Sequence, residues 1–214
     1  HDGRLIGYLG ADNYEVNDLV NTQGILELVS YFIGYKITNH NLMAQLEHLS
    51  RYDDLTGLHN RNAMIEKVKQ LQQCSGSIGI IYADLNGLKE INDTLGHQAG
   101  DKALKKVADV LIRCYGIENS YRVGGDEFLV FLPIPTVSDF RNSVKRLRTA
   151  VLEKKDISLA IGCEWSAGTE GISKALQTTD HRMYCDKAEY YNHKGKCEDK
   201  RRGVRSKGIL SLME

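Results

Sequence analysis

Hydrophobic and polar residues follow different patterns in successive parts of the chain. Residues 1–20 contain a short apolar run, Leu5 to Leu9, followed by polar positions. Residues 21–52 place apolar side chains at helical spacing. Helix-like and strand-like patterns then alternate up to about residue 195. We therefore expect the end of an upstream domain (1–20), a helical linker (21–52), a folded domain (53–195) and a basic tail (196–214).

Within 53–195 the spacing predicts the order helix, strand, helix, two hairpin strands, helix, strand, helix. The strand at 78–85, IGIIYADL, is apolar almost throughout, which is typical of a strand buried on both faces. Hairpin strands and crossover strands in one sheet predict an α/β fold, an α+β sandwich of split βαβ type. The other expected ranges are helix 61–73 capped by Asn60, helix 101–115 capped by Asp101, hairpin 121–132, helix 138–155, strand 157–165 and helix 171–193.

The predicted hairpin, YRVGGDEFLVFL, combines glycines with acids. Gly124 and Gly125 indicate a tight turn, because glycine takes positive φ without steric cost. Asp126 and Glu127 follow at once, although adjacent carboxylates repel and strands disfavour acids. If the strand ending near Asp84 lies beside this hairpin, three carboxylates meet at one sheet edge. Mg²⁺ or Mn²⁺ would relieve the repulsion, since both prefer hard oxygen ligands.

A short loop, NGLK at 86–89, follows Asp84 and enters a helical stretch. Its backbone N–H groups could cradle phosphates, and Lys89 would add a cation. Because Mg²⁺ is commonly shared between carboxylates and substrate phosphates, a nucleotide is the expected partner. The sequence holds no Gly-x-x-x-x-Gly-Lys-Ser/Thr motif, so this would not be a P-loop site. Each feature alone has an ordinary structural explanation, and only their combination indicates a site.

Composition narrows the function classes. Lys plus Arg and Asp plus Glu both number 28, so a net charge of zero argues against a general nucleic-acid binder. The sequence has no run of 18 apolar residues, and its five cysteines form no Cys-x-x-Cys pair. We expect reduced thiols and a cytoplasmic domain. Since the sequence starts at His1, we also expect a fragment of a larger signalling protein.

The motifs together resemble one known family. GGDEF at 124–128 resembles the signature of the GGDEF family of diguanylate cyclases. Supporting matches are DDLTGLHNR (53–61), DLNGLKEINDTLGHQAGD (84–101) and DHRMYCDK (180–187). The resemblance covers residues 53 to about 195. It implies a sheet like the palm of nucleotide cyclases and polymerases, and a reaction that condenses two GTP molecules into cyclic di-GMP and two pyrophosphates.

The resemblance also implies catalytic roles for single residues. Asp84 and Asp126 would bind Mg²⁺ or Mn²⁺, two ions per active site, with help from the carbonyl of Leu85. Glu127 would help to activate the ribose 3′-hydroxyl, directly or as a further metal ligand. One ion would lower the pKa of that hydroxyl, and both would offset charge on the α-phosphate and the leaving pyrophosphate.

The substrate-binding set comes from the same resemblance. Asn92 and Asp101 would read guanine, whose N1–H and N2–H₂ donors suit amide and carboxylate acceptors. Lys89 and Lys187 would contact phosphates. The residues expected to contact GTP are Asn86, Gly87, Leu88, Lys89, Asn92, Asp101 and Lys187.

The sequence departs from the family pattern at several positions. Asn86 and Leu88 replace an Asp and a Phe, with little expected loss. Tyr191 replaces a basic residue, which would weaken the grip on the triphosphate. Tyr115 and Glu118 stand where the product-inhibition site has Arg and Asp, so that site would be weak or absent.

The linker would join two copies of the chain. Condensing two GTP molecules requires two active sites to face each other, so we expect a homodimer. About three heptads indicate a coiled coil, with Asn39 fixing its register. The alternative is one amphipathic helix packed on its own domain. The seam would hold Leu28, Tyr35, Leu42 and Leu49 at one position and Phe32, Asn39 and Leu46 at the other.

Other interpretations stay open at this level. GRLIGYLGADNY, within residues 1–20, resembles the end of a GAF-type sensory domain. A degenerate domain that binds GTP or a protein partner without catalysis is the alternative to an active cyclase. Its expected mark is the loss of one of the three acids, and all three are present. A different dinucleotide product would be favoured if Asp101 were a small hydroxyl residue.

Overall fold

The computed structural model describes residues 22–73, 76–168 and 171–193. The expectations for a GAF-like remnant at 1–20 and a basic tail at 196–214 lie outside the described residues. The chain divides into two units, 1–49 and 50–214.

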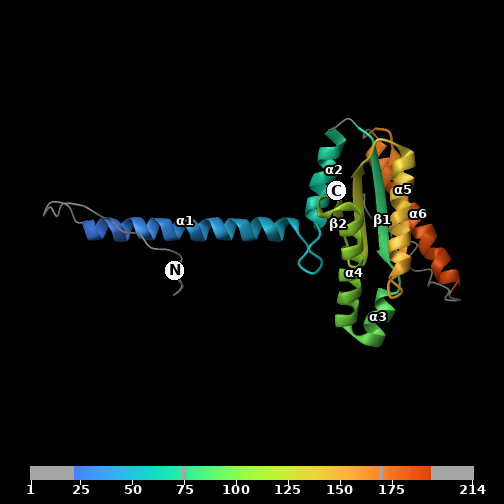
Figure 1. Ribbon diagram of the computed structural model, residues 1–214, viewed down its shortest axis with the longest axis horizontal. Helices are drawn as coiled ribbons and strands as arrows, with labels where there is room; N and C mark the ends of the chain where they lie inside the picture. The colour runs from blue at the N-terminus through green and yellow to red at the C-terminus, as the bar shows by residue number, and fades with distance from the viewer. Residues whose placement is uncertain (1–21, 74–75, 169–170, 194–214) are drawn as a thin grey trace. The chain divides into compact units, whose positions relative to one another are not determined.

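The first unit consists, in its described part, of one long helix. Helix α1 (Thr22–Arg51) runs without a break for 30 residues (Figure 1). Within the described part of this unit nothing covers its apolar seam, since Leu28, Tyr35, Leu42 and the other apolar seam residues are each more than half exposed. In the part of the chain that the structure describes, no helix has the length and apolar character of a membrane span.

The second unit contains one four-stranded sheet. The strand order is β2-β3-β1-β4, and every neighbouring pair is antiparallel. This arrangement of helices on a sheet confirms the predicted fold class. The elements are α2 (Arg61–Gln73), β1 (Ile78–Leu85), α3 (Leu88–Leu95), α4 (His97–Tyr115), η1 (Ile117–Asn119), β2 (Ser120–Arg122), β3 (Glu127–Pro133), α5 (Val137–Glu153), β4 (Leu159–Ser166) and α6 (Ile172–His193).

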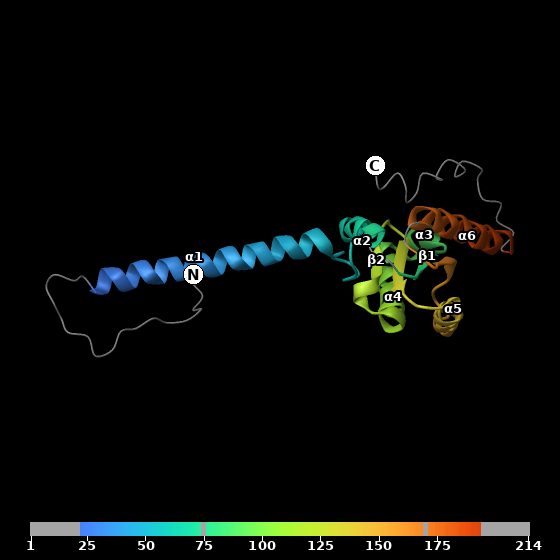
Figure 2. The same ribbon diagram turned by 90° about the horizontal axis from the view of Figure 1, so that it is seen from above.

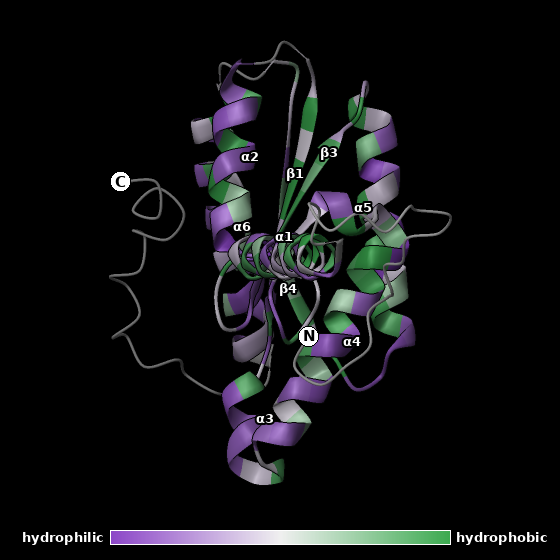
Figure 3. Ribbon diagram, turned by 90° about the vertical axis from the view of Figure 1, so that its left-hand side faces the viewer, coloured by the Kyte–Doolittle hydropathy of each residue, from purple (hydrophilic) through white to green (hydrophobic). Residues whose placement is uncertain are grey.

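Helices cover both faces of the sheet. Figure 2 shows α2 and α6 on one side and α4 and α5 on the other. All eight residues of the central strand β1 are buried, as predicted. Ile80 and Tyr82 belong to the core under α2 and α6, whereas Ile81 and Ala83 belong to the core under α4 and α5. Strands β1 and β3 accordingly carry mainly hydrophobic residues (green in Figure 3).

Two helix starts test the predicted caps. Asn60 caps α2 as predicted, since its side-chain oxygen accepts a hydrogen bond from the Ala63 N–H at 3.1 Å. The predicted cap at Asp101 is wrong, because α4 begins at His97 and Asp101 lies inside it. Gly96, with φ of 82°, separates α4 from the additional short helix α3. The helical signal after residue 88 therefore belongs to two helices joined at a glycine.

The turn of the hairpin also differs from its prediction. Strands β2 and β3 pair as expected, but neither Gly124 nor Gly125 has a positive φ. A side chain at Gly124 would instead collide with the carboxylate of Glu127. The missing side chain at Gly124 therefore leaves room for this carboxylate.

Helix α6 is held closely against β4. A side chain at Gly162 would collide with the backbone of Thr179 and Met183. The Asp186 carboxylate accepts a hydrogen bond from the Ile161 N–H at 2.7 Å, and Arg182 donates to the Cys163 carbonyl at 2.6 Å. These contacts fix the position of α6 along the strand.

Candidate active site

Strand register brings the predicted acids together. Asp84 of β1 lies directly opposite Glu127 of β3, so both side chains stand on the same face of the sheet. The N–H of Leu85 donates to the carbonyl of Asp126 at 2.9 Å, which ties the turn to the end of β1. The predicted meeting of three acids at one sheet edge is therefore present in the backbone arrangement.

Asp84 is the most constrained of the three acids. It is only 3% exposed. Burial, followed by the negative charge of Asp126, raises the pKa of Asp84 to about 7 even though Lys187 opposes the rise. Ionised carboxylates at this edge therefore need a positive partner.

Lys187 supplies that partner in the structure. This α6 residue is 9% exposed, and its Nζ donates to Oδ1 and Oδ2 of Asp84 at 2.7 and 2.8 Å. The sequence comparison with the family implied a phosphate contact for Lys187, and the structure places it on the carboxylate instead. Helix α6 therefore belongs to the site together with β1 and the hairpin.

Tyr82 is a neighbour of the acids that the sequence reading missed. Burial, followed by the negative charge of Glu127, raises the pKa of Tyr82 well above its usual range. Its hydroxyl also hydrogen-bonds the side chain of Glu127. The sequence contained a signal for this neighbour, because alternate residues of a strand, such as 82 and 84, point to the same face of the sheet.

The loop after β1 is pinned from two sides. Asn86 is buried, its N–H donates to the carbonyl of Ser158 at 2.9 Å, and its side-chain nitrogen donates to the hydroxyl of Ser158 at 3.2 Å. The N–H of Gly87, which has φ of 74°, donates to the hydroxyl of Tyr191 at 3.3 Å. A residue on α6 therefore already contacts the loop that we expected to cradle phosphates.

The predicted base readers lie on the α3–α4 pair. Asn92 of α3 packs so tightly on Gly100 of α4 that a side chain there would collide with its amide oxygen. This oxygen is buried and has no hydrogen-bond partner among the described residues. Asp101 follows Gly100 and is exposed, as is Lys89 on the first turn of α3. An acceptor without a donor beside an exposed carboxylate suits a ligand that brings N–H groups.

The donor set fits a divalent cation by its chemistry. The carboxylates of Asp84, Asp126 and Glu127 and the carbonyl of Leu85 are hard oxygen ligands at one sheet edge. As the side chains lie, the described residues contain no ready group of three or more His, Cys, Asp or Glu around one point. By the chemistry of their oxygen atoms, these residues suit Mg²⁺ or Mn²⁺.

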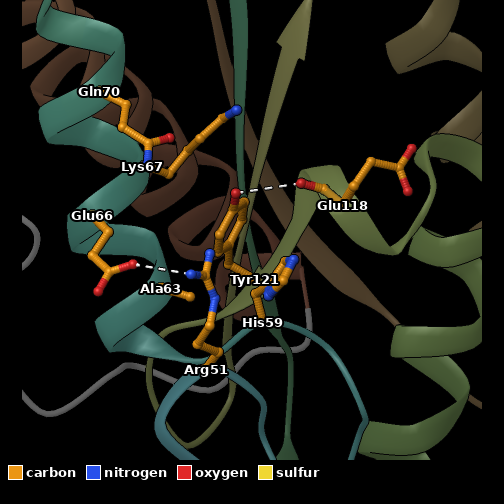
Figure 4. A pocket seen from close by; sticks show the side chains of 8 residues that line it. All are labelled: Arg51, His59, Ala63, Glu66, Lys67, Gln70, Glu118 and Tyr121. Atoms are coloured by element: carbon orange, nitrogen blue, oxygen red, sulfur yellow. Dashed lines mark hydrogen bonds and ion pairs between the residues drawn. The ribbon is translucent and has the colours of Figure 1, made fainter. Parts of the chain in front are cut away.

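A separate polar pocket lies against α2 (Figure 4). Its lining includes Arg51, His59, Lys67, Glu118 and Tyr121. The His59 ring stacks on Tyr121 with centroids 5.3 Å apart, and burial lowers the pKa of His59. None of the predicted catalytic or GTP-contacting residues lines this pocket. The pocket is distinct from the sheet edge that holds Asp84, Asp126 and Glu127.

The two substitutions at the expected product-inhibition site differ in exposure. Tyr115 is buried, and its hydroxyl donates to the carbonyl of Ser143 at 3.0 Å. Glu118 is exposed and lines the pocket of Figure 4. Tyr115 is thus a core residue that packs toward α5 rather than a surface contact.

Known proteins resemble this chain in sequence. The family model described as "Diguanylate cyclase, GGDEF domain" matches residues 50–193. The uncharacterized protein YtrP of Bacillus subtilis is 33% identical over 157 residues, which are 72% of this chain and 26% of that protein. An uncharacterized protein of Mycobacterium tuberculosis is 35% identical over 142 residues, 63% of this chain and 22% of that protein. The chain thus spans about a quarter of these relatives.

Solved structures share the fold. The coiled coil and GGDEF domain of DgcB from Caulobacter crescentus, in complex with c-di-GMP, has a TM-score of 0.67 at 21% identity, covering 79% of this chain and 94% of that one. The GGDEF domain of TpbB from Pseudomonas aeruginosa has a TM-score of 0.56 at 27% identity, covering 64% and 89%. The fold of the sheet domain therefore has counterparts of known structure.

Proposed function

The chain belongs to the GGDEF family of diguanylate cyclase domains, and from this premise we propose that it condenses two GTP molecules into cyclic di-GMP and two pyrophosphates. The main support for the proposal is that Asp84 of β1 lies directly opposite Glu127 of β3, with Asp126 at the adjoining turn. The proposed reaction would take place in the cytoplasm.

The acids would act through a divalent cation. Asp84, Asp126 and the carbonyl of Leu85 would hold Mg²⁺ or Mn²⁺, with Glu127 as a further ligand or as the proton acceptor. The cation would lower the pKa of the ribose 3′-hydroxyl and offset charge at the α-phosphate. Tyr82, which hydrogen-bonds Glu127, would hold this carboxylate in position. Glu127 would take the proton of the 3′-hydroxyl directly or through the cation.

Guanine specificity would come from α3 and α4. The amide oxygen of Asn92, which has no partner among the described residues, would accept one N–H of guanine. The carboxylate of Asp101 would accept another. Adenine lacks these donors and would leave the acceptors unsatisfied, at a cost of about 1–3 kcal/mol. Phosphates would lie along residues 86–89, with Lys89 supplying charge.

The active enzyme would be a homodimer joined through α1. Each domain would hold one GTP, and the two reacting halves would face each other across a two-fold axis. The exposed apolar seam of α1 supports this arrangement, since a second copy would cover it. The coiled coil in the DgcB structure is a precedent for such a helix beside a GGDEF domain. A signal from an upstream domain would reach the two sites along this helix.

The proposal is tested by incubating the chain with Mg²⁺ and either GTP or ATP and identifying the products by mass spectrometry. We expect cyclic di-GMP and pyrophosphate from GTP only, and no product when EDTA removes the cation. A chain that binds GTP tightly but forms no product, at a concentration where it is dimeric, would favour a regulatory module instead.

A further inference from the structure

Helix α6 presents two side chains, one helical turn apart, to the end of β1 and its loop. Lys187 donates to both oxygens of Asp84, and Tyr191 accepts a hydrogen bond from the Gly87 N–H. Residues four apart on a helix point in the same direction, so both contacts come from one face of α6. This face of α6 therefore contacts both the carboxylate of Asp84 and the loop at residues 86–89.

Each of these two side chains supplies a group like one that a metal–nucleotide complex would supply. The ammonium of Lys187 places a positive charge on Asp84, as a metal ion would. The hydroxyl oxygen of Tyr191 accepts from a loop N–H, as a phosphate oxygen would. At Asp84 and Gly87, then, a cation and an acceptor oxygen are both supplied by the protein itself.

We infer that Lys187 and Tyr191 are internal substitutes for the cation and a phosphate oxygen, and that the metal–nucleotide complex binds by displacing both. This inference rests on the proposed function, because it assigns Asp84 to the metal and the loop to the phosphates. On displacement, Lys187 moves from the carboxylate of Asp84 to the incoming phosphates, and the N–H of Gly87 is released.

The exchange makes cation and nucleotide binding depend on each other. A cation that arrives alone displaces Lys187 and leaves a largely buried ammonium without a partner, which is costly. A cation that arrives with a triphosphate brings a new anionic partner for Lys187. Divalent metal and nucleotide therefore bind with positive coupling, each raising the affinity for the other.

The test measures Mn²⁺ binding by electron paramagnetic resonance on the 214-residue chain, with Mn²⁺ alone and with a non-hydrolysable GTP analogue. Lys187→Met is expected to bind Mn²⁺ alone about tenfold more tightly than wild type, and the Mn²⁺–analogue complex about tenfold more weakly. Lys174→Met removes the same charge from an exposed position of α6 and is expected to change neither value. If Lys187→Met leaves the affinity for Mn²⁺ alone unchanged or lowers it, the inference is overturned.

Tyr191→Phe tests the second contact and keeps the packing of α6. It is expected to tighten binding of the Mn²⁺–analogue complex about twofold to fivefold, because the Gly87 N–H no longer has a competing acceptor. Unchanged or weaker binding would overturn the role of Tyr191. This variant decides the question if thermal unfolding shows that Lys187→Met does not fold.

The design separates this inference from the proposed function. If wild type neither binds the analogue nor makes cyclic di-GMP, the proposed function fails, while the measurements with Mn²⁺ alone still report the exchange at Asp84. If wild type makes cyclic di-GMP and Lys187→Met shows no gain for Mn²⁺ alone, the inference fails and the function stands.

Discussion

Arg122 binds Asp53 through one guanidinium nitrogen that donates to both carboxylate oxygens, at 3.0 and 3.2 Å. The other terminal nitrogen of Arg122 donates to the carbonyl of Gly125 at 2.8 Å. Asp53 lies directly after the linker helix, and Gly125 precedes the metal-binding candidate Asp126. A single side chain thus connects the start of the GGDEF domain to the turn that carries Asp126.

We predict that Asp53→Asn destabilises the domain by about 1–3 kcal/mol at pH 7, because the charged partner of Arg122 is lost. Chemical denaturation of both proteins measures the difference. Asp54→Asn is the matched control, since the neighbouring carboxylate is exposed. Asp53→Asn should also slow cyclic di-GMP synthesis, whereas Asp54→Asn should not. Equal stability of the two variants would show that the Arg122 bridge contributes little.

The same pair predicts a pH dependence. Burial alone would raise the pKa of Asp53, but hydrogen bonds from Thr56 and Arg122 outweigh it and hold the pKa below its model-peptide value of 3.8. Since the unfolded chain then takes up the proton first, this stabilisation is present above pH 3.8 and is lost as the pH falls further. The stability difference between wild type and Asp53→Asn should therefore shrink below that pH. A difference that stays constant down to acid unfolding would contradict the sign of the shift.

Glu127→Gln should reduce cyclic di-GMP formation by a factor of about 10²–10⁴ while GTP binding is largely retained. The amide keeps the shape of the side chain but accepts no proton and is a poorer metal ligand. Product formation and equilibrium binding of a GTP analogue separate the two effects. Glu153→Gln, on the exposed side of α5, is the control for the chemical change itself. Turnover of Glu127→Gln near the wild-type rate would remove Glu127 from the proposed mechanism.

Added cyclic di-GMP should inhibit the enzyme only weakly through the product site of the family. Tyr115 is buried and carries no charge, so it cannot replace an Arg that grips phosphate. Initial rates at increasing cyclic di-GMP and several GTP concentrations measure this. Strong noncompetitive inhibition would reveal a site formed by other residues.

Asn39→Leu should strengthen association of two α1 helices and alter cyclic di-GMP synthesis without touching the active site. Asn39 falls in the predicted seam, where a buried amide fixes register at a cost in stability. Sedimentation and product assays on wild type, on Asn39→Leu and on a chain starting at Arg51 test the idea. Asn41→Leu makes the same change outside the seam. If the shortened chain dimerises and turns over like the full one, α1 does not control activity.

The sequence allowed the sheet and the acid edge to be predicted because their signals are local. The apolar run of β1 and the cap at Asn60 depend on neighbouring residues alone. From the sequence, the acids were expected to meet only if β1 lay beside the hairpin, and the strand register shows that it does. The division between α3 and α4 was missed because His97 to Gly100 carries little apolar periodicity and Asp101 imitates a cap.

The contacts from α6 could not be predicted in the same way. Lys187 and Asp84 are 103 residues apart, and only the packing of α6 on β4 brings them together. Family resemblance gave Lys187 a phosphate partner, which describes a bound state. Without a ligand the buried carboxylate takes the nearest cation, and this choice depends on burial and distance rather than on any sequence motif.

The contact at Gly162 also constrains how fast the site can respond. At Gly162 the backbone of α6 packs against β4 with no side chain between them. Asp186, which precedes Lys187 in α6, accepts a hydrogen bond from Ile161 of β4. The backbone of α6 therefore has no room to slide or tilt there. Any exchange at Asp84 then proceeds by rotation of the Lys187 side chain. This rotation requires none of the collective helix movement that takes microseconds or longer. Binding of metal and GTP to the site of each protomer should therefore be fast, and the encounter of the two GTP-bound domains should set the rate of turnover.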